Sequence, residues 1–305
     1  MEKADITIVI PTFNGLKLLK NNLKRVLAVS SGAQVVIVDD GSTDGTSEWL
    51  RREFPQVAIL TLPTNQGFAR AVNAGVWSVN TPIVVLLNND AVPESGWLDP
   101  LRASLTDKDV FAVGCLEKGE REGKRIESGR GIGAFEKGLL QHARGESARY
   151  TLWATGGSAA FNREKWVSLG GMDDLYAPFY WEDIDISYRA WKRGWKVLFE
   201  SQSVVRHTHE QTIGLHYPRW KIKAASIKNQ LLFMSKHVTD FDVLLGHILW
   251  MPIHLGGSLF FGNLTFVLGF FWALVYLPKA MIRRVSNGVT LKGDKEVLTR
   301  ACASE

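Results

Sequence analysis

Short apolar runs alternate with helical patterns over the first hundred residues of the chain. Continuous apolar segments are typical of strands buried on both faces, and they occupy residues 6–10, 35–38, 57–60 and 83–87. Between them, apolar residues recur every three or four positions, which predicts helices over 16–27, 49–54 and 68–77. Strands that alternate with helices predict an α/β domain with a mostly parallel, twisted sheet flanked by helices, as in a Rossmann-like fold.

The middle of the chain has weaker patterns. Residues 117–149 are rich in Gly, Lys, Glu and Arg and have no sustained apolar period, which predicts irregular loops or edge structure over the sheet. A helix is predicted to start near Glu182, because Ile184, Tyr188 and Trp191 form one apolar stripe and Gly194 suits the end of the helix. Short strands are then expected at 195–199 and 204–205.

The composition changes after residue 206. Residues 206–237 hold six Lys or Arg and one acidic residue, whereas the 35 residues 243–277 hold no charged side chain. This apolar segment is longer than the roughly 20 residues that span a bilayer, and Pro252, Gly256 and Gly257 interrupt it. The aromatic residues suited to the headgroup region are Trp250, Trp272 and Tyr276. The segment predicts membrane association, with a buried helical hairpin of a soluble protein as the alternative.

Basic residues flank the apolar segment on both sides. Lys236 precedes it, and Lys279, Arg283 and Arg284 follow it. The positive-inside tendency places both flanks on the cytoplasmic side, which excludes a single crossing. Two arrangements remain: a hairpin broken near residues 252–257, or helices in the plane of the interface. Because 35 residues are short for two full spans, we expect shallow helices that dip into one leaflet.

The composition excludes some classes of function. The net charge of +5 is mild, and no compact basic patch interleaved with aromatic residues appears in the first half, so no nucleic-acid partner is expected. Cys115 and Cys302 match no metal or disulfide spacing, as is common in a reducing compartment. The first residues lead directly into a predicted strand of about five residues, too short for the apolar part of a signal peptide.

Polar residues follow each predicted strand of the first hundred residues. Ligands bind beyond the carboxyl ends of the strands in such sheets. The residues at these ends are Pro11, Thr12, Asp39, Asp40, Asn65, Arg70, Asn88, Asn89 and Asp90. Carboxylates there bind a base or ribose, or else cap turns. Arg70 is suited to a phosphate, and Asp90 to a hard divalent ion that offsets the charge of a diphosphate.

These residues belong to a longer series of motifs. The segments IVIPTFN, VIVDDGSTDGT, NQGFARAVNAG and LLNND, followed by GGSAAFNREKWVSLGGMDDLYAPFYWEDIDISYRAWKRGW, resemble the family 2 glycosyltransferases, which have the GT-A fold. The chain looks most similar to rhamnosyltransferase-like members of bacterial polysaccharide assembly. The resemblance covers roughly residues 5–215 and implies a catalytic domain over 1–215, with nucleotide-sugar binding in 1–110 and the acceptor side in 111–215. A basic and apolar helical membrane-associating region would occupy 216–305.

The resemblance implies roles for individual residues. The donor-binding positions are Pro11, Thr12, Asp39 and Asp40 on the base side, Asn65 and Arg70 on the nucleoside and phosphate side, and Asn88 and Asn89. Asp90 is the only carboxylate at the place of the family's D-x-D metal motif, and His207 matches a metal or diphosphate ligand, which implies Mn²⁺ or Mg²⁺ as cofactor. Trp153, Gly157 and Trp181 fall on the acceptor side, where an aromatic ring either faces a sugar or packs in the core.

Glu182 and Asp183 match the family's catalytic acid pair, with Asp183 at the position of the general base. An inverting transfer needs a carboxylate within hydrogen-bond reach of the acceptor hydroxyl, on the face of the sugar opposite the leaving diphosphate. The first turn of a helix fixes such a carboxylate, and the positive helix end favours its ionised form. Acidic residues in a first helical turn are also common without any catalytic role.

The sequence therefore predicts an inverting glycosyltransferase with a nucleotide-diphosphate sugar as donor. We expect a UDP- or dTDP-sugar, with rhamnose as the first candidate, and a lipid-linked or polysaccharide acceptor in cell-envelope glycan synthesis at the cytoplasmic face of the inner (plasma) membrane. The alternatives are a polyprenyl-phosphate sugar synthase and a catalytically silent sugar-nucleotide-binding membrane protein. A nucleotidyltransferase is disfavoured because PTFNGLK lacks a Gly-rich triphosphate loop, and a dehydrogenase because no G-x-G-x-x-G follows the first strand.

Overall fold

The computed structural model describes residues 5–121, 124–207, 217–286 and 290–303. Its first part confirms the predicted alternation of strands and helices. The elements are β1 (Ile6–Thr12), α1 (Leu16–Val29), β2 (Gln34–Asp39), α2 (Thr46–Glu53), β3 (Ala58–Thr61), α3 (Phe68–Trp77) and β4 (Ile83–Leu87). Strands β1 to β4 pair in parallel, in the order β3-β2-β1-β4.

The second part extends the same sheet with antiparallel neighbours. Its elements are β5 (Ala91–Pro93), α4 (Leu98–Ser104), β6 (Val110–Arg121), β7 (Lys124–Ser128), β8 (Gly131–Glu136), β9 (Leu139–Arg144), β10 (Ser158–Asn162), α5 (Arg163–Ser168), the 3₁₀ helix η1 (Asp174–Tyr176), α6 (Glu182–Lys192) and β11 (Lys196–His207). The full order is β3-β2-β1-β4-β10-β6-β11-β5, with β7 paired to β6. The sheet is therefore mixed beyond β4, because β10 runs antiparallel to both β4 and β6.

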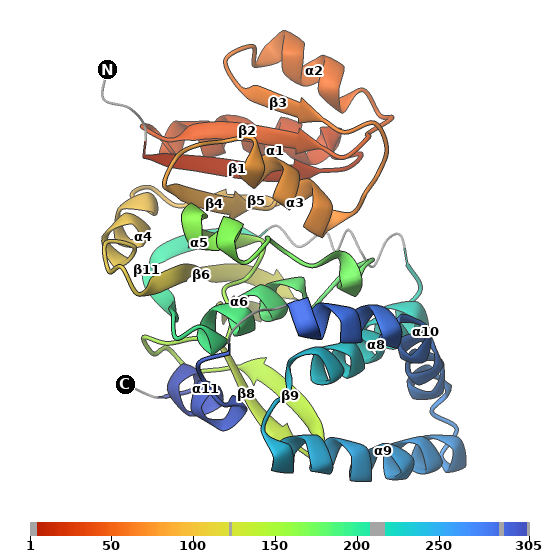
Figure 1. The fold of residues 1–305 in the computed structure, drawn as a ribbon. Coiled ribbons are helices and arrows are strands. Elements are labelled where there is room, and N and C mark those ends of the chain that lie inside the picture. The colour runs from red at the N-terminus through yellow and green to blue at the C-terminus, as the bar shows by residue number, and fades with distance from the viewer. Residues whose placement is uncertain (1–4, 122–123, 208–216, 287–289, 304–305) are drawn as a thin grey trace.

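Helices cover both faces of this sheet (Figure 1). All seven residues of β1 are buried, as the continuous apolar run predicts. Val9 faces a core with Val72 of α3, whereas Ile8 faces the opposite core with Leu19 of α1. Gly75 lets α3 approach the sheet closely, since a Cβ there would lie 2.5 Å from a methyl group of Val9.

The prediction of irregular structure over residues 117–149 is wrong in part. The segment contains the end of β6, β7 and the separate β8–β9 hairpin. The hairpin turns at Lys137 and Gly138, both with positive φ (48° and 73°), as a two-residue turn requires. Its strands carry many exposed polar side chains, so they lack the apolar run by which the buried strands are recognised.

The two short strands predicted at 195–199 and 204–205 are halves of one strand, β11. Its pairing with β6 shifts register between Glu200 and Val204, where the polar residues separate the two apolar runs. Helix α6 begins at Glu182, and Gly194 follows its end with φ of 81°, as predicted.

The C-terminal part is helical, with α8 (Arg219–His237), α9 (Phe241–Phe260), α10 (Leu264–Ser286) and α11 (Asp294–Ala301). The break expected near residues 252–257 lies instead at 261–263, where Gly262 has φ of 69° and ends α9. Pro252 stays inside α9. Both α9 and α10 are long and apolar enough to cross a membrane, with mean hydropathies of 1.4 and 1.6, and little of either is buried.

Two of the aromatic residues predicted at the headgroup level have another contact. The rings of Trp272 and Tyr276 on α10 lie 4.8 and 5.0 Å from Nζ of Lys228 on α8. Lys236, predicted as part of a free basic flank, is buried and paired with Asp173 and Asp185. Helix α10 therefore packs against the rest of the protein through polar groups as well as apolar ones.

Helix α11 is fixed by the buried carboxylate of Asp294. It accepts hydrogen bonds from the Tyr188 hydroxyl at 2.5 Å and from the backbone N–H of Thr239 and Asp240 at 2.6 and 2.7 Å, and it pairs with Lys192 at 2.7 Å. One carboxylate thus joins α11 to α6 and to the turn between α8 and α9.

We expect Asp294→Ala to destabilise the protein by about 3–5 kcal/mol, because it leaves a buried Lys192 without its counter-ion. Thermal or denaturant unfolding measures the change. Asp242→Ala is the matched control, since Asp242 forms a solvent-exposed pair with Lys295 and its loss should leave the Tm unchanged. Equal effects of the two substitutions would contradict the structural role of Asp294.

Candidate active site

The loops that follow β2 and β3 are held by two carboxylates predicted to bind a donor. Asp39 accepts hydrogen bonds from the backbone N–H of Ser42 at 2.9 Å and from the hydroxyl of Ser47. The two oxygens of Asp40 accept from the backbone N–H groups of Gln66 and Gly67 at 2.8 and 2.9 Å. Burial raises the pKa of Asp40, although both N–H donors oppose this. The two acids therefore shape the loops at which a nucleotide would bind.

The ends of β1 and β4 also meet at this edge. Nδ2 of Asn89 donates to Oγ1 of Thr12 at 2.8 Å, and Pro11 is buried beside them in β1. The backbone N–H of Asn88 donates to the carbonyl of Gly157 at 2.9 Å. The structure thus brings Thr12, Asn89, Asn88 and Gly157 together, as a common site requires.

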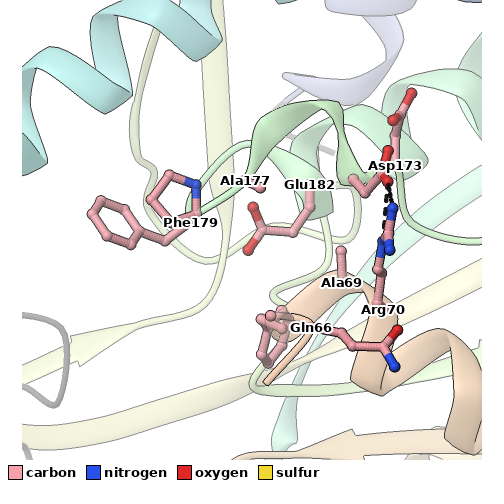
Figure 2. A pocket seen from close by; sticks show the side chains of 11 residues that line it. Gln66, Ala69, Arg70, Asp173, Ala177, Phe179 and Glu182 are labelled. Atoms are coloured by element: carbon pink, nitrogen blue, oxygen red, sulfur yellow. Dashed lines mark hydrogen bonds and ion pairs between the residues drawn. The ribbon is translucent and has the colours of Figure 1, made fainter. Parts of the chain in front are cut away.

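A pocket lies between α3 and the start of α6 (Figure 2). It is lined by Gln66, Gly67, Phe68, Ala69, Arg70, Asp173, Asp174, Ala177, Pro178, Phe179 and Glu182. Arg70 is paired with Asp174 at 2.5 Å, so the predicted phosphate-binding guanidinium already has a carboxylate partner. Asn65 is exposed on the turn that leads into this pocket.

Asp90 and His207, the two predicted metal ligands, lie side by side. Nδ1 of His207 is 3.6 Å from Oδ1 of Asp90, and its Nε2 is 3.6 Å from Oε1 of Glu117. Burial disfavours the imidazolium, but the two carboxylates outweigh it and raise the pKa of His207 to about 9. Within the described residues, no group of three or more His, Cys, Asp or Glu side chains is arranged to hold a metal ion.

Glu117, which contacts His207, was not among the predicted site residues. It also accepts hydrogen bonds from the hydroxyls of Thr155 and Ser158 at 2.9 and 2.7 Å. Burial raises its pKa, but His207, Arg144 and Ser158 outweigh this and hold the pKa well below its usual range. A carboxylate directly after the apolar run 110–116 is the same signal that marks Asp39 and Asp90, but the segment from 117 was predicted as irregular loops or edge structure.

The predicted catalytic pair stands in the first turn of α6, which follows two strained residues. Tyr180 and Trp181 have φ of 70° and 80°, which is rare for residues other than glycine. Oδ1 of Asp183 accepts from the backbone N–H of Ile184 at 2.9 Å and Oδ2 from that of Gly156 at 3.4 Å. Asp183 therefore faces the turn next to Gly157 and Asn88, whereas Glu182 faces the pocket of Figure 2.

Burial raises the pKa of both carboxyl groups of this pair. The neighbouring charge of Asp183 adds to burial and raises the pKa of Glu182 to about 8, whereas two backbone N–H donors and Arg144 oppose the upward shift at Asp183. At neutral pH, Glu182 therefore holds a proton, and burial makes the carboxylate of Asp183 a stronger proton acceptor than an exposed one.

The predicted acceptor-side tryptophans are packed in the interior. Trp153 and Trp181 are 5% and 2% exposed, and each ring contacts His142 of β9, with ring centroids 5.5 and 5.1 Å apart. Trp181 also packs on Phe233 of α8. Neither ring lines the pocket, so the geometry favours the core alternative for both.

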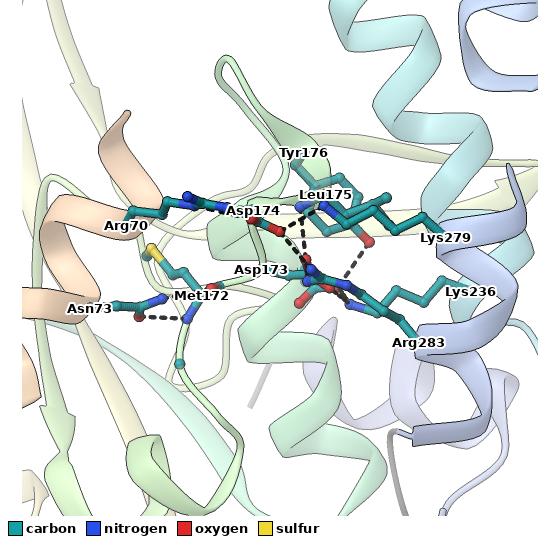
Figure 3. Close-up of polar contacts among 12 residues, drawn as sticks. Arg70, Asn73, Met172, Asp173, Asp174, Leu175, Tyr176, Lys236, Lys279 and Arg283 are labelled. Carbon is teal, nitrogen blue, oxygen red and sulfur yellow. Dashed lines mark hydrogen bonds and ion pairs between the residues drawn. The ribbon is translucent and has the colours of Figure 1, made fainter. Parts of the chain in front are cut away.

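An ion network that the sequence analysis did not predict surrounds the pocket (Figure 3). Asp174 binds Arg70, Lys279 and Arg283, and Asp173 binds Arg283 and Lys236. The cations come from α3, α8 and α10, so the residues before α6 are held from three directions. The buried carboxylate of Asp185 continues the network through Lys236.

The fold and this edge define the protein as an α/β protein with polar groups at the ends of parallel strands and an acid pair at the start of a helix. The sequence model of glycosyl transferase family 2 matches residues 7–168. The chain therefore belongs to this family.

Curated relatives come from Mycobacterium tuberculosis. A pre-mycofactocin glycosyltransferase is 28% identical over 214 residues, which cover 67% of this chain and 43% of that protein. An N-acetylglucosaminyl-diphospho-decaprenol L-rhamnosyltransferase is 24% identical over 218 residues, 62% of this chain and 70% of the other. The chain thus spans less than half the length of the first relative.

Solved structures show the same fold. GalNAc-T7, crystallised with UDP, GalNAc and Mn²⁺, matches 79% of this chain and 49% of its own with a TM-score of 0.63 and 19% identity. The mannosyltransferase PcManGT from Pyrobaculum calidifontis, in complex with GDP-Man and Mn²⁺, matches 92% of this chain and 87% of its own with a TM-score of 0.56 and 19% identity. The prediction of a GT-A fold is confirmed.

Gly157 offers a test of the strand-end site. A Cβ at this position would lie 2.5 Å from Nδ2 of Asn88, so we expect Gly157→Ala to displace that amide and to weaken binding of UDP or dTDP at least severalfold in calorimetry. Gly114→Ala is the control, because its Cβ would meet its nearest neighbour at an ordinary 3.6 Å. Unchanged nucleotide affinity in Gly157→Ala would remove Asn88 and Gly157 from the site.

Proposed function

We propose that this protein is an inverting glycosyltransferase that transfers a sugar from a nucleotide-diphosphate donor to an acceptor hydroxyl. The observation that carries the proposal is the half-buried Glu182–Asp183 pair beside the edge where Asn88 and Gly157 meet. In this proposal Asp183 is the general base, since it faces that edge and its raised pKa makes it a stronger proton acceptor.

The donor would lie across the carboxyl ends of β1, β2 and β4. Pro11, Thr12, Asp39 and Asp40 would form the base side, the two acids mainly by holding the loops in place. Asn65 and Arg70 would face the nucleoside and phosphates, and Asn88 and Asn89 the sugar-diphosphate. We expect a UDP- or dTDP-sugar, and rhamnose is supported by the L-rhamnosyltransferase among the relatives.

A divalent ion, Mn²⁺ or Mg²⁺, fits the residues at Asp90 and His207. A carboxylate oxygen and an imidazole nitrogen lie 3.6 Å apart there, and a two-residue ligand set leaves positions for diphosphate oxygens. Glu117 contacts the other imidazole nitrogen and would orient the ring, as partners of metal-binding histidines do. When bound, the ion offsets the charge of the departing diphosphate. Both solved neighbours were crystallised with Mn²⁺.

A donor panel with a product-nucleotide readout tests the proposal, with Mn²⁺ or Mg²⁺ and with chelator. We expect transfer to require the ion.

We expect Asp183→Asn to lower turnover by about 10²-fold or more, because the lost base acts on the acceptor. Nucleotide affinity should be retained. Glu182→Gln is the matched control. It should retain more activity, since Glu182 is already neutral at pH 7. Turnover of Asp183→Asn within a few-fold of the wild type would identify another base.

The acceptor is proposed to be lipid-linked, in cell-envelope glycan synthesis, with the protein at the cytoplasmic face of the plasma membrane. A relative whose name specifies a decaprenol-linked substrate supports a lipid-linked acceptor. A polyprenyl phosphate would serve the same site, so a polyprenyl-phosphate sugar synthase is the second candidate. The exposed apolar side chains that would meet the lipid on α9 are Phe241, Leu245, Ile248, Leu249, Ile253, Leu259 and Phe260.

Two contacts support helices that lie in the interface. Lys236 and Arg283, on opposite flanks of the apolar segment, both bind Asp173, which supports both flanks on one side of the membrane. Along α9, His247 and His254 each form a hydrogen bond of 2.7 Å with a carbonyl of the β8–β9 turn, at Gly138 and Lys137. A crossing α9 would carry this turn into the bilayer, so we propose that α9 lies in the plane of the interface.

Labelling of Asn263→Cys, between α9 and α10, measures the arrangement in sealed inverted membrane vesicles. We expect a membrane-impermeant maleimide to react as fast as with Glu48→Cys on exposed α2, because both thiols face the cytoplasmic side. Cys302 is a poor reporter, since its thiol contacts the backbone of Gly133 and burial raises its pKa. Reaction of Asn263→Cys only after the vesicles are opened would show that the two helices cross the bilayer.

A further inference from the structure

The backbone immediately before the proposed catalytic pair has a strained conformation that other groups must stabilise. Residues 176–181, which we call the 176–181 loop, join η1 to α6. The loop ends in Tyr180 and Trp181, two consecutive non-glycine residues in the left-handed region. Such conformations are strained and persist only where the surroundings enforce them. The groups that enforce them therefore determine where Glu182 and Asp183 lie.

Two neighbouring side chains of α8 bind the carbonyls of this loop. Nδ2 of Asn229 lies 2.7 Å from the carbonyl oxygen of Tyr176 and 2.9 Å from those of Phe179 and Tyr180. Nζ of Lys228 donates to the carbonyl of Ala177 at 2.5 Å. Both side chains are fully buried. The carbonyls of four of the six loop residues are thus bound by one pair of side chains.

The ammonium group of Lys228 is itself held by α10. It lies 4.8 Å from the ring of Trp272 and 5.0 Å from that of Tyr276, distances at which a cation and an aromatic face attract. Burial, and next the charge of Lys279, lower the pKa of Lys228 to about 8, whereas Glu182 opposes the shift. The two rings therefore stabilise a cation that its surroundings otherwise disfavour.

We propose that Lys228 and Asn229 are positioning residues for the transfer reaction, and that Trp272 and Tyr276 of α10 complete their support of the 176–181 loop. The position of the catalytic pair then depends on α10, which belongs to the apolar segment proposed to contact the membrane. This inference rests on the proposed function. It adds that the acceptor-side geometry depends on the docking of α10, and that donor binding at the strand ends does not.

The test compares Lys228→Met with Lys223→Met. The first removes the cation and keeps most of the length of the side chain, and the second makes the same change at an exposed position of the same helix. We expect kcat of Lys228→Met to fall at least about tenfold, because displacements of about 1 Å at a reacting centre have effects of up to about 10². Nucleotide affinity and binding stoichiometry should match the wild type. Lys228→Arg should recover part of kcat, and Lys223→Met should change nothing.

Amide hydrogen exchange provides a readout that does not depend on activity. Peptides covering residues 176–185 should exchange faster in Lys228→Met than in the wild type or Lys223→Met. If the wild type transfers no sugar, the proposed function fails, and this measurement still decides whether Lys228 orders the loop. A wild-type kcat and exchange rate in Lys228→Met would overturn the proposal. A loss of kcat matched by a lower binding stoichiometry reports unfolded protein, and the Tyr276 variants then decide.

Tyr276 supplies a second pair of variants in case Lys228→Met does not fold. Tyr276 is 37% exposed, so its replacement disturbs the core little. Tyr276→Phe keeps the ring and should keep kcat, whereas Tyr276→Leu removes it and should lower kcat and speed exchange over residues 176–185. Equal kcat values in the two variants would overturn the role assigned to α10.

Discussion

The carboxylate of Asp185 lies in the interior and binds four side chains, and the arrangement of the C-terminal half depends on it. It accepts hydrogen bonds from the Tyr176 hydroxyl at 2.8 Å and from Arg189 at 2.8 Å, and it contacts Lys236 at 2.5 Å and His237 at 2.6 Å. Burial raises its pKa, but the charges of Arg189 and Lys236 and the contact with His237 outweigh burial and hold the pKa well below the usual range. A buried charge is costly unless every partner is in place, so α6 and α8 meet in one register.

The same constraint extends to the proposed catalytic pair. Lys236 binds Asp173 as well as Asp185, and Asp173 and Asp174 bind Arg283 of α10. The segment that leads to Glu182 and Asp183 is therefore bounded by cations from helices far apart in the sequence. The strand-end residues are organised differently, by short hydrogen bonds between neighbouring loops such as that from Gln66 to Asp40. The predicted donor side is thus joined by hydrogen bonds between loops at one edge of the sheet, and the segment before α6 by ion pairs from three helices.

This difference explains what the sequence could predict. Buried parallel strands have apolar runs, and their ends carry the polar groups, so β1 to β4 and the polar residues at their ends could be predicted from pattern alone. The β8–β9 hairpin was missed because its exposed strands have no such run. Glu117 was missed with it. The pairing of the acids in GGMDD with cations more than sixty residues later could not be predicted, because such contacts depend on how helices pack.

The contacts of α8 and α10 with the 176–181 loop affect how truncated forms of the protein can be interpreted. A chain cut near residue 215, at the predicted end of the catalytic domain, would keep every strand-end residue but lose Lys228, Asn229 and the cations opposite Asp173. Inactivity of such a fragment would have two indistinguishable causes, absence of a lipid surface and collapse of the loop before Glu182. The intact chain in detergent separates them, because it retains every internal contact while the bilayer is gone.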